Sequence, residues 1–320
     1  MSTQAVKEFT KGADWQSRLK EVGYFVDGDM AEKIARWWVA PEPLILEGPP
    51  GTGKTSFARK IAHAARAQLY RLQCYEGITA QVALYSFNKR LQDLAIERAF
   101  NKGELPENLA EIVFDESCMV RGKIAQSFLD TSDEIIVLVD EMDKAKDGAL
   151  EAAMLEFFDE GTITVQETNR ILSPVTGKKP HIIVTSNAGL DKSGLKSGGK
   201  ATLSYPILRR SKFIHLAEPT VQRQAEILRS EVPQLSETMC LACALFVQKM
   251  NNLHEMEKSI ALSETIGWAR SMALIGASEL TEDLVYRTRD DLAKSELDLK
   301  RLSGNTPQII SMIKSHFTNR

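Results

Sequence analysis

The chain contains 320 residues, of which 43% are hydrophobic and 26% charged, the average balance of a soluble globular protein. Forty basic and 43 acidic side chains give a net charge of −3, which excludes recruitment to nucleic acid or anionic lipid by bulk positive charge. No apolar run approaches the roughly 18 residues of a membrane-spanning helix, and the N-terminus lacks the apolar stretch of a signal peptide. We therefore expect a cytoplasmic protein with room for two modest domains.

Predicted strands and helices alternate through the first two thirds of the chain. The first forty residues favour helices at 16–22 and 30–39, which Pro41 and Pro43 end. Continuous apolar runs then predict strands at 44–47, 69–73, 134–139 and 181–185, and helical spacing predicts helices at 54–67, 79–100, 117–129 and 148–159. Continuous rather than alternating apolar strands indicate an α/β domain with a parallel sheet covered by helices on both faces.

Two further segments depart from this alternation. Polar and apolar residues alternate after Gly161 and predict a hairpin within 161–180, whereas the Gly- and Ser-rich stretch 190–203 predicts a mobile loop. A short strand is expected at 213–216. Beyond residue 219 only helices are evident, at 220–230, 236–250, 263–277 and 281–300. We therefore expect an N-terminal helical segment (1–40), an α/β domain (41–218) and a small all-α domain (219–320).

The four cysteines are too few for a disulfide framework in a chain of this length. Cys240 and Cys243 share one helix face in an apolar stretch, without a second pair to complete a zinc site. Core packing is the favoured interpretation, and a metal or redox role is the alternative.

The first motif is a phosphate-binding loop placed between a predicted strand and a predicted helix. The sequence Gly48-Pro49-Pro50-Gly51-Thr52-Gly53-Lys54-Thr55 fits G-x-x-x-x-G-K-[ST], and we expect the nucleotide-binding segment to extend to Ser56. Glycines let backbone N–H groups curl around phosphate oxygens at the positive end of the helix. Lys54 would neutralise the β- and γ-phosphates, and the Thr55 hydroxyl would ligate Mg²⁺.

An acidic pair distinguishes an ATPase from other phosphate-loop proteins. The apolar strand at 134–139 ends in Asp140 and Glu141, whose side chains point in different directions in an extended chain. Asp140 can hold the magnesium shell beside Thr55, and Glu141 can activate water as a general base. A kinase needs no such base, and the N-K-x-D guanine-recognition motif of GTPases is missing.

A third polar position follows the next core strand. Asn187 ends the strand at 181–185 near the same sheet edge, where ligands of open parallel sheets bind. Asn187 can therefore reach the attacking water, although an asparagine after a strand is also a common turn former.

These motifs together resemble an AAA+ ATPase of the MoxR family. The resemblance rests on GPPGTGKT (48–55), IIVLVDEMDKA (135–145), HIIVTSN (181–187) and YPILRRSKF (205–213), followed by a helical region. The segments RLQCYEG (71–77) and ALYSFN (83–88) are similar to the CoxD-like subgroup. The resemblance implies a P-loop AAA+ parallel-sheet domain followed by an all-α lid, with ATP and Mg²⁺ as cofactors.

The resemblance also implies a hexameric ring with ATP at each subunit junction. An arginine finger would reach the neighbouring subunit's γ-phosphate from Arg209 or Arg210, of which Arg210 is preferred. Thr265 stands where the family's lid domain carries an arginine, which puts coupling of the lid to ATP in doubt; Arg270 is a possible substitute. The inserts at 79–101 and 161–180 would touch the client.

Three functions follow from these expectations. The leading one is an ATPase that remodels a protein partner as an assembly chaperone or activator; relatives work with von Willebrand A domain proteins, and the subgroup with metallocofactor maturation. An alternative is a nucleic-acid-directed motor or a defence-system ATPase. The net negative charge argues against the nucleic-acid motor. A third is a scaffold that binds ATP without hydrolysing it, which Glu141, Asn187 and Arg210 disfavour.

Overall fold

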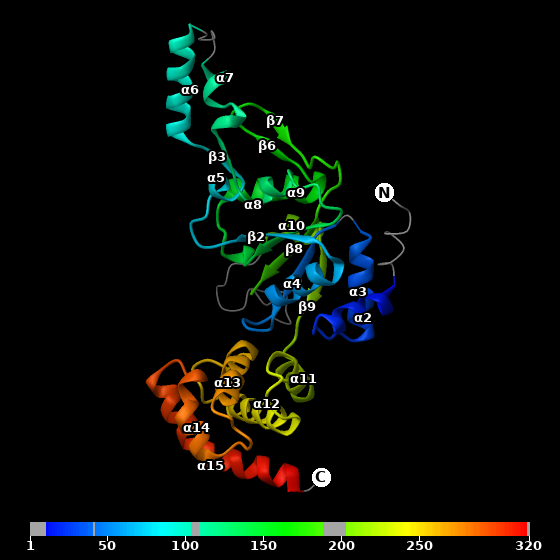
Figure 1. Cartoon of the computed structure of the whole chain (residues 1–320), viewed down its shortest axis with the longest axis vertical. Helices are drawn as coiled ribbons and strands as arrows, with labels where there is room; N and C mark the ends of the chain where they lie inside the picture. Colours follow the sequence, from blue (N-terminus) through cyan, green and yellow to red (C-terminus); the bar gives the residue numbers. More distant parts are fainter. Residues whose placement is uncertain (1–10, 41, 104–108, 188–202, 319–320) are drawn as a thin grey trace. The chain divides into compact units, whose positions relative to one another are not determined.

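The chain divides into two compact units (Figure 1). The computed structural model describes residues 11–40, 42–103, 109–187 and 203–318. The first unit comprises Met1–Glu47 and Thr55–His215, and the second comprises Gly48–Lys54 and Leu216–Arg320. The phosphate loop is thus grouped with the helical C-terminal part.

A five-stranded sheet forms the centre of the first unit. Its strands are β1 (Leu44–Glu47), β2 (Gln68–Gln73), β5 (Ile135–Asp140), β8 (His181–Ser186) and β9 (Lys212–His215). Their spatial order is β2-β5-β8-β1-β9, and every pairing is parallel. Every residue of β1 and of β5 is buried, as the continuous apolar runs predict. The predicted parallel α/β sheet is confirmed.

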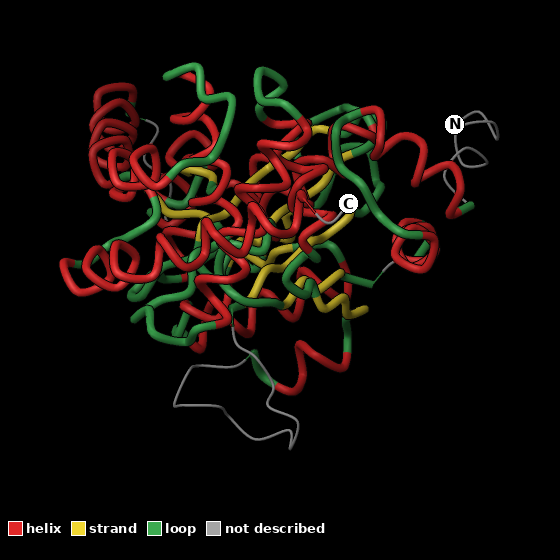
Figure 2. The backbone as a smooth tube through the Cα atoms, turned by 90° about the horizontal axis from the view of Figure 1, so that it is seen from below, coloured by secondary structure: helices red, strands yellow, loops and turns green. Residues whose placement is uncertain are grey.

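Helices cover both faces of this sheet, and Figure 2 shows them in red around the yellow strands. Val137, Val139, Ile182 and Val184 share one buried cluster with Phe157, so this face packs against α8 (Lys123–Ser127) and α9 (Gly148–Glu160). Alternate strand residues point to the opposite face, where α2 (Gly12–Glu21), α3 (Gly28–Trp38) and α4 (Lys54–Ala65) lie.

The strand order places three functional strands side by side. Strand β8 lies between β5 and β1, with Val139 opposite Val184 and Ile45 opposite Val184 on the other side. Because parallel strands end at the same edge, the acidic pair at the end of β5 and Asn187 after β8 lie at one edge of the sheet. Thr55, in the first turn of the helix that follows β1, contacts Asp140 at this edge.

Two helices expected from the sequence are interrupted by strands. The segment 79–100 forms α5 (Ala80–Ala83), β3 (Tyr85–Phe87) and α6 (Lys89–Lys102), and 117–129 forms the 3₁₀ turn η1 (Glu116–Cys118), β4 (Met119–Arg121) and α8. The expectation of two largely continuous helices is wrong here. The reason is that β3 and β4 pair with each other across more than thirty residues, and helical periodicity carries no information on such pairing.

The predicted hairpin at 161–180 is confirmed. Strands β6 (Ile163–Val165) and β7 (Arg170–Leu172) pair antiparallel. They follow Gly161, which has φ of +73° and ends α9. The short helices α7 (Ala110–Val113) and α10 (Tyr205–Arg209) and the 3₁₀ turn η2 (Met142–Lys144) complete the unit. The expected loop at 190–203 lies outside the described residues except for Leu203.

Described residues after position 216 form helices only. They are α11 (Val221–Glu231), α12 (Glu237–Asn252), α13 (Leu262–Leu274), α14 (Glu282–Thr288), η4 (Arg289–Asp291) and α15 (Glu296–Thr318). Their core surrounds α12, where the ring centroids of Phe246 and Trp268 lie 5.4 Å apart. Cys240 and Cys243 are free and buried in this core.

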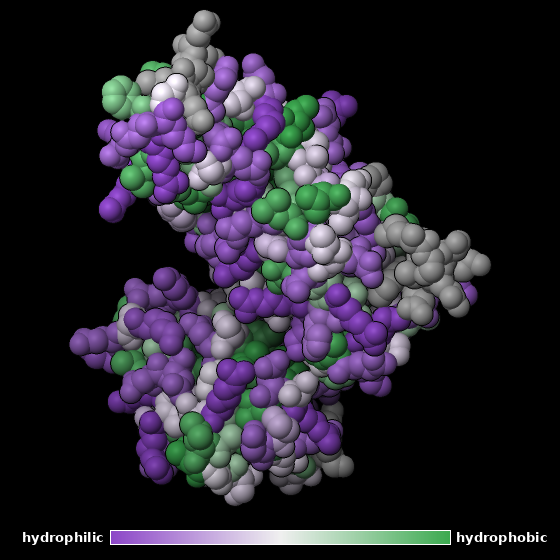
Figure 3. All heavy atoms as spheres, turned by 45° about the horizontal axis from the view of Figure 1, so that its top comes forward, coloured by the Kyte–Doolittle hydropathy of each residue, from purple (hydrophilic) through white to green (hydrophobic). Residues whose placement is uncertain are grey.

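The expected single helix at 281–300 is wrong, because the chain turns after Thr288. The Thr288 hydroxyl accepts a hydrogen bond from Trp268 Nε1 (2.8 Å) and donates one to the Leu284 carbonyl (2.8 Å). A tertiary contact therefore accompanies the end of α14. In the described part of the chain, no helix is long and apolar enough to cross a bilayer, and the face drawn in Figure 3 is mainly hydrophilic.

Candidate nucleotide-binding site

The phosphate loop adopts a backbone that depends on its glycines. Gly51 has φ of +81° and Gly53 has φ of +89°. Residues that carry a Cβ atom rarely adopt such values. The Thr52 hydroxyl donates to the Pro49 carbonyl (2.9 Å) and closes the loop. Helix α4 begins directly after Gly53, so its N-terminal N–H groups point toward the loop, as anion binding requires.

Lys54 lies folded against this loop. Its Nζ donates to the carbonyls of Gly48 (2.7 Å) and Pro49 (2.9 Å), and the side chain is buried, with 7% exposed. The ammonium group is therefore held at the loop by backbone oxygens. Ser56, in the first turn of α4, is exposed.

Thr55 and Asp140 lie in direct contact. The Thr55 hydroxyl is 3.0 Å from Asp140 Oδ2 and 3.1 Å from Oδ1, and Asp140 is only 1% exposed. A hydroxyl and a carboxylate are the hard oxygen ligands that Mg²⁺ prefers, beside phosphate oxygens. The two residues therefore fit a magnesium site.

Glu141 and Asn187 also meet. Asn187 Nδ2 donates to Glu141 Oε1 (3.4 Å), and Glu141 Oε2 accepts from Lys144 Nζ (2.6 Å) and from Gln73 Nε2 (2.9 Å). Glu141 has φ of +57°, rare for a non-glycine residue. This turn separates the direction of its carboxylate from that of Asp140, and the hydrogen bond to Glu141 raises the pKa of Lys144.

Three neighbours of the acidic pair lie in the quoted motifs but were not predicted as site residues. Thr185 Oγ1 donates to Asp140 Oδ1 (2.5 Å) and accepts from the Glu141 backbone N–H (2.8 Å). Arg71 Nε donates to Asp140 Oδ2 (2.8 Å), and Gln73 holds Glu141 as described. Arg71 and Gln73 are alternate residues of β2, next to the acidic strand. Polar residues with period two in an otherwise apolar sheet are the signal that could have revealed them.

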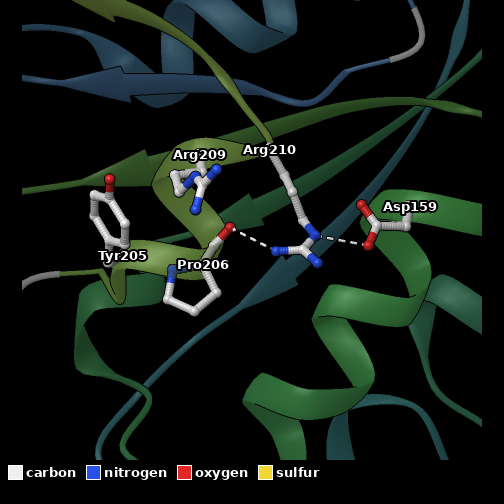
Figure 4. A pocket seen from close by; sticks show the side chains of 5 residues that line it. All are labelled: Asp159, Tyr205, Pro206, Arg209 and Arg210. Carbon is white, nitrogen blue, oxygen red and sulfur yellow. Dashed lines mark hydrogen bonds and ion pairs between the residues drawn. The ribbon is translucent and has the colours of Figure 1, made fainter.

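The expected arginines line a pocket of their own, away from the acidic pair in sequence (Figure 4). Asp159, Tyr205, Pro206, Arg209 and Arg210 surround it. Arg210 Nε donates to Asp159 Oδ2 (2.6 Å), and its Nη1 donates to the Pro206 carbonyl (3.2 Å). The Arg209 guanidinium lies over the Tyr205 ring, 5.6 Å from its centroid.

Within the second unit, Thr265 occupies the position at which the resembled family carries the lid arginine, and its side chain is uncharged. It is fully buried and its hydroxyl donates to the Ala261 carbonyl of its own helix (3.0 Å). Arg270 forms an ion pair with Glu231 (3.1 Å). In the same unit, a Cβ atom on Gly51 would lie 2.4 Å from the Ala261 Cβ, so the loop requires glycine there on steric grounds as well.

The comparisons with known proteins concern the fold and the family. The chain is similar to the Thermotoga maritima RuvB Holliday junction branch migration motor, with 15% identity, a TM-score of 0.44, and coverage of 91% of this chain and 76% of that one. A variant of that motor with one proline replaced by glycine gives 17% identity, a TM-score of 0.45, and coverage of 92% and 76%. A search of curated proteins found no match.

One protein-family model matches the chain. The model of the AAA domain, dynein-related subfamily, matches residues 43–210, more than half of the chain. The matched segment holds the phosphate loop, the acidic pair, Asn187 and both candidate arginines. The chain belongs to the dynein-related subfamily of AAA domains and carries an AAA+ ATPase fold.

Proposed function

We propose that this protein is a magnesium-dependent ATPase that converts ATP and water to ADP and phosphate. The observation that carries this proposal is the contact between Thr55 and the buried Asp140, next to the pair formed by Glu141 and Asn187. Two oxygen ligands for a metal thus lie beside a carboxylate with a polar partner. Metal ligands beside a carboxylate that can activate water favour hydrolysis of ATP over phosphate transfer to another substrate.

Each residue has a separate part in the reaction. Residues 48–56 cradle the phosphates, and the Lys54 ammonium exchanges its carbonyl partners for the β- and γ-phosphate oxygens. Thr55 and Asp140 would hold Mg²⁺, which would supply positive charge against the negative charge of the phosphates. Glu141 accepts a proton from the attacking water, and the Asn187 amide orients that water.

Arg210 is our candidate for the arginine finger, with Arg209 as the alternative. Arg210 comes from the end of α10, and its guanidinium borders an exposed pocket. In a ring, such a group reaches the γ-phosphate bound by the neighbouring subunit and stabilises the transition state. The proposal therefore includes assembly into a ring. The resemblance to MoxR ATPases implies that this ring has six subunits.

The work done by hydrolysis is, in this proposal, the remodelling of a protein partner. The MoxR-like motifs support it, as does the absence of net positive charge. In that family the partner commonly contains a von Willebrand A domain, and the CoxD-like subgroup acts in metallocofactor assembly. We propose a client of this class for the present chain.

The first experiment is ATP turnover of the purified protein, with its mass in solution, across a salt series with and without DNA or RNA. We expect ATP-dependent ring formation and turnover that is indifferent to nucleic acid. Stimulation by nucleic acid that fades with salt would instead identify a nucleic-acid motor. Nucleotide binding without any turnover, alone or with a partner, would indicate a scaffold.

A further inference from the structure

Arg71 reaches the carboxylate assigned to the metal. Its Nε and Nη2 atoms lie 2.8 Å and 2.6 Å from Asp140 Oδ2, the same oxygen that lies 3.0 Å from the Thr55 hydroxyl. The guanidinium also donates to the Gln73 side-chain carbonyl. One cation is therefore fixed at the oxygen atom that faces the Mg²⁺ ligand Thr55.

The burial of Asp140 explains why a cation is needed. A carboxylate that is 1% exposed loses its hydration, and this loss costs several kcal/mol unless an opposite charge compensates it. Its other hydrogen-bond donors, Thr55 and Thr185, are neutral. Arg71 supplies a positive charge and a hydrogen bond to this carboxylate.

The position of Arg71 allows it to give way. It lies on β2, one of the two edge strands of the described sheet, and 38% of its side chain is exposed. The guanidinium can therefore turn toward solvent, whereas Asp140 cannot. A long side chain on an edge strand needs only rotamer changes for this movement, without a change in the backbone.

We propose that Arg71 holds Asp140 in the nucleotide-free protein and competes with Mg²⁺ for it, so that Arg71 sets the metal requirement of nucleotide binding. The inference rests on the proposed ATPase function. Two cations at one carboxylate oxygen repel each other, so Mg²⁺ enters only together with the negative phosphates of ATP. Arg71 is thus a positioning residue that keeps free metal out of the empty site.

The first test compares magnesium titrations of the binding of a fluorescent ATP analogue. The variant R71Q is expected to reach half-maximal binding at a Mg²⁺ concentration lower by about tenfold, because a charge-assisted hydrogen bond is worth at least about a factor of ten in an equilibrium. R71K keeps the charge and is expected to stay near the wild type. R287Q is the matched control, since Arg287 forms an exposed ion pair with Asp283.

A merely structural role of Arg71 predicts a different result. R71Q would then lose thermal stability, but its magnesium midpoint would equal that of the wild type, and this outcome overturns the proposal. A midpoint at higher Mg²⁺ in R71Q also overturns it. If the wild type binds no Mg·ATP at all, the proposed function fails; an unchanged midpoint in a binding-competent R71Q refutes only the role of Arg71.

The second test uses the wild-type protein, so it does not depend on whether a variant of Arg71 folds. Electron paramagnetic resonance counts free Mn²⁺, a substitute for Mg²⁺, in the presence of wild-type protein. Without nucleotide we expect Mn²⁺ to stay free, and with ATP we expect saturable binding. Saturable Mn²⁺ binding to the nucleotide-free wild type that disappears in D140N contradicts competition by Arg71.

Discussion

The Thr55 hydroxyl lies 3.0 Å from Asp140 Oδ2, although the two residues are 85 positions apart in the chain. Thr55 stands at the start of α4 and Asp140 at the end of β5. Since β8 alone separates β5 from β1, the helix that follows β1 begins above the end of β5. The sheet order therefore brings the two proposed magnesium ligands together, and the predictions below concern this edge of the sheet and its surroundings.

Replacing Glu141 with glutamine separates binding from hydrolysis. E141Q keeps the hydrogen-bonding shape but cannot accept a proton, so we expect ATP binding within about twofold of the wild type and turnover reduced by about 10²–10⁴. Phosphate release and analogue binding are the measurements. E237Q, at a residue that is 78% exposed, serves as the control, and unchanged turnover in E141Q would refute the role of Glu141 as base.

Thr185 connects both carboxylates and is expected to be required for their geometry. Valine in its place keeps the shape but removes one of the hydrogen bonds that Asp140 accepts, and it removes the hydroxyl acceptor of the Glu141 N–H. We expect T185V to lose about 1–3 kcal/mol of unfolding free energy and most of its ATP turnover. T185S restores the hydroxyl and should recover both. Full activity of a stable T185V would contradict this role.

Arg209 and Arg210 form a natural pair of matched variants. If Arg210 is the finger, R210A binds ATP normally but loses turnover by about 10³ or more. R209A removes the contact with Tyr205 and stays near the wild type. Turnover at increasing protein concentration, with ATP affinity measured alongside, checks this. The reverse ranking would assign the finger to Arg209.

Glu134 should make stability depend on pH in a defined range. Burial acts to raise its pKa, but hydrogen bonds from His181 and Lys178 outweigh burial, and the pKa lies below its ordinary value of 4.5. A lowered pKa in the folded state stabilises the protein above the unfolded pKa and loses this effect as the pH falls through the folded value. The free energy of unfolding of the wild type should therefore exceed that of E134Q by about 1 kcal/mol at pH 7.

Urea unfolding at pH 7 and pH 4 measures this difference. The gap between wild type and E134Q is expected to narrow as the pH falls below about 4.5. The exposed-site variant E237Q should follow the wild type at both values. Parallel curves for E134Q and wild type across the whole range would show that the contacts of Glu134 do not contribute.

The cysteines are expected to be inert in the folded protein. Burial raises the pKa of Cys74 to about 12 and also raises the pKa of Cys240 and of Cys243. Because the thiolate is the reactive form, a thiol reagent at pH 8 should react with the native protein at least about 100-fold more slowly than with the urea-unfolded chain. Rapid native reaction of Cys240 or Cys243 would revive the redox alternative.

The elements that the sequence predicts well are those with a local cause. Strands at 44–47 and 134–139 are continuous apolar runs, and they became β1 and β5 within one residue. The hairpin after Gly161 carries its own alternation and turn residues. By contrast, β3 and β4 were missed because each owes its strand conformation to the other, and the helix expected at 281–300 missed the contact between Trp268 and Thr288.

By itself the sequence determined the motifs, that is, which residues can bind phosphate, hold a metal and accept a proton, because these depend on residue type and short spacing. The tertiary structure alone decided which of them touch. Arg71, Gln73 and Thr185 reach the acidic pair only because β2 and β8 flank β5 in the sheet. Strand order arises from long-range packing and hydrogen bonding between segments far apart in the chain, and no local pattern of residues encodes it.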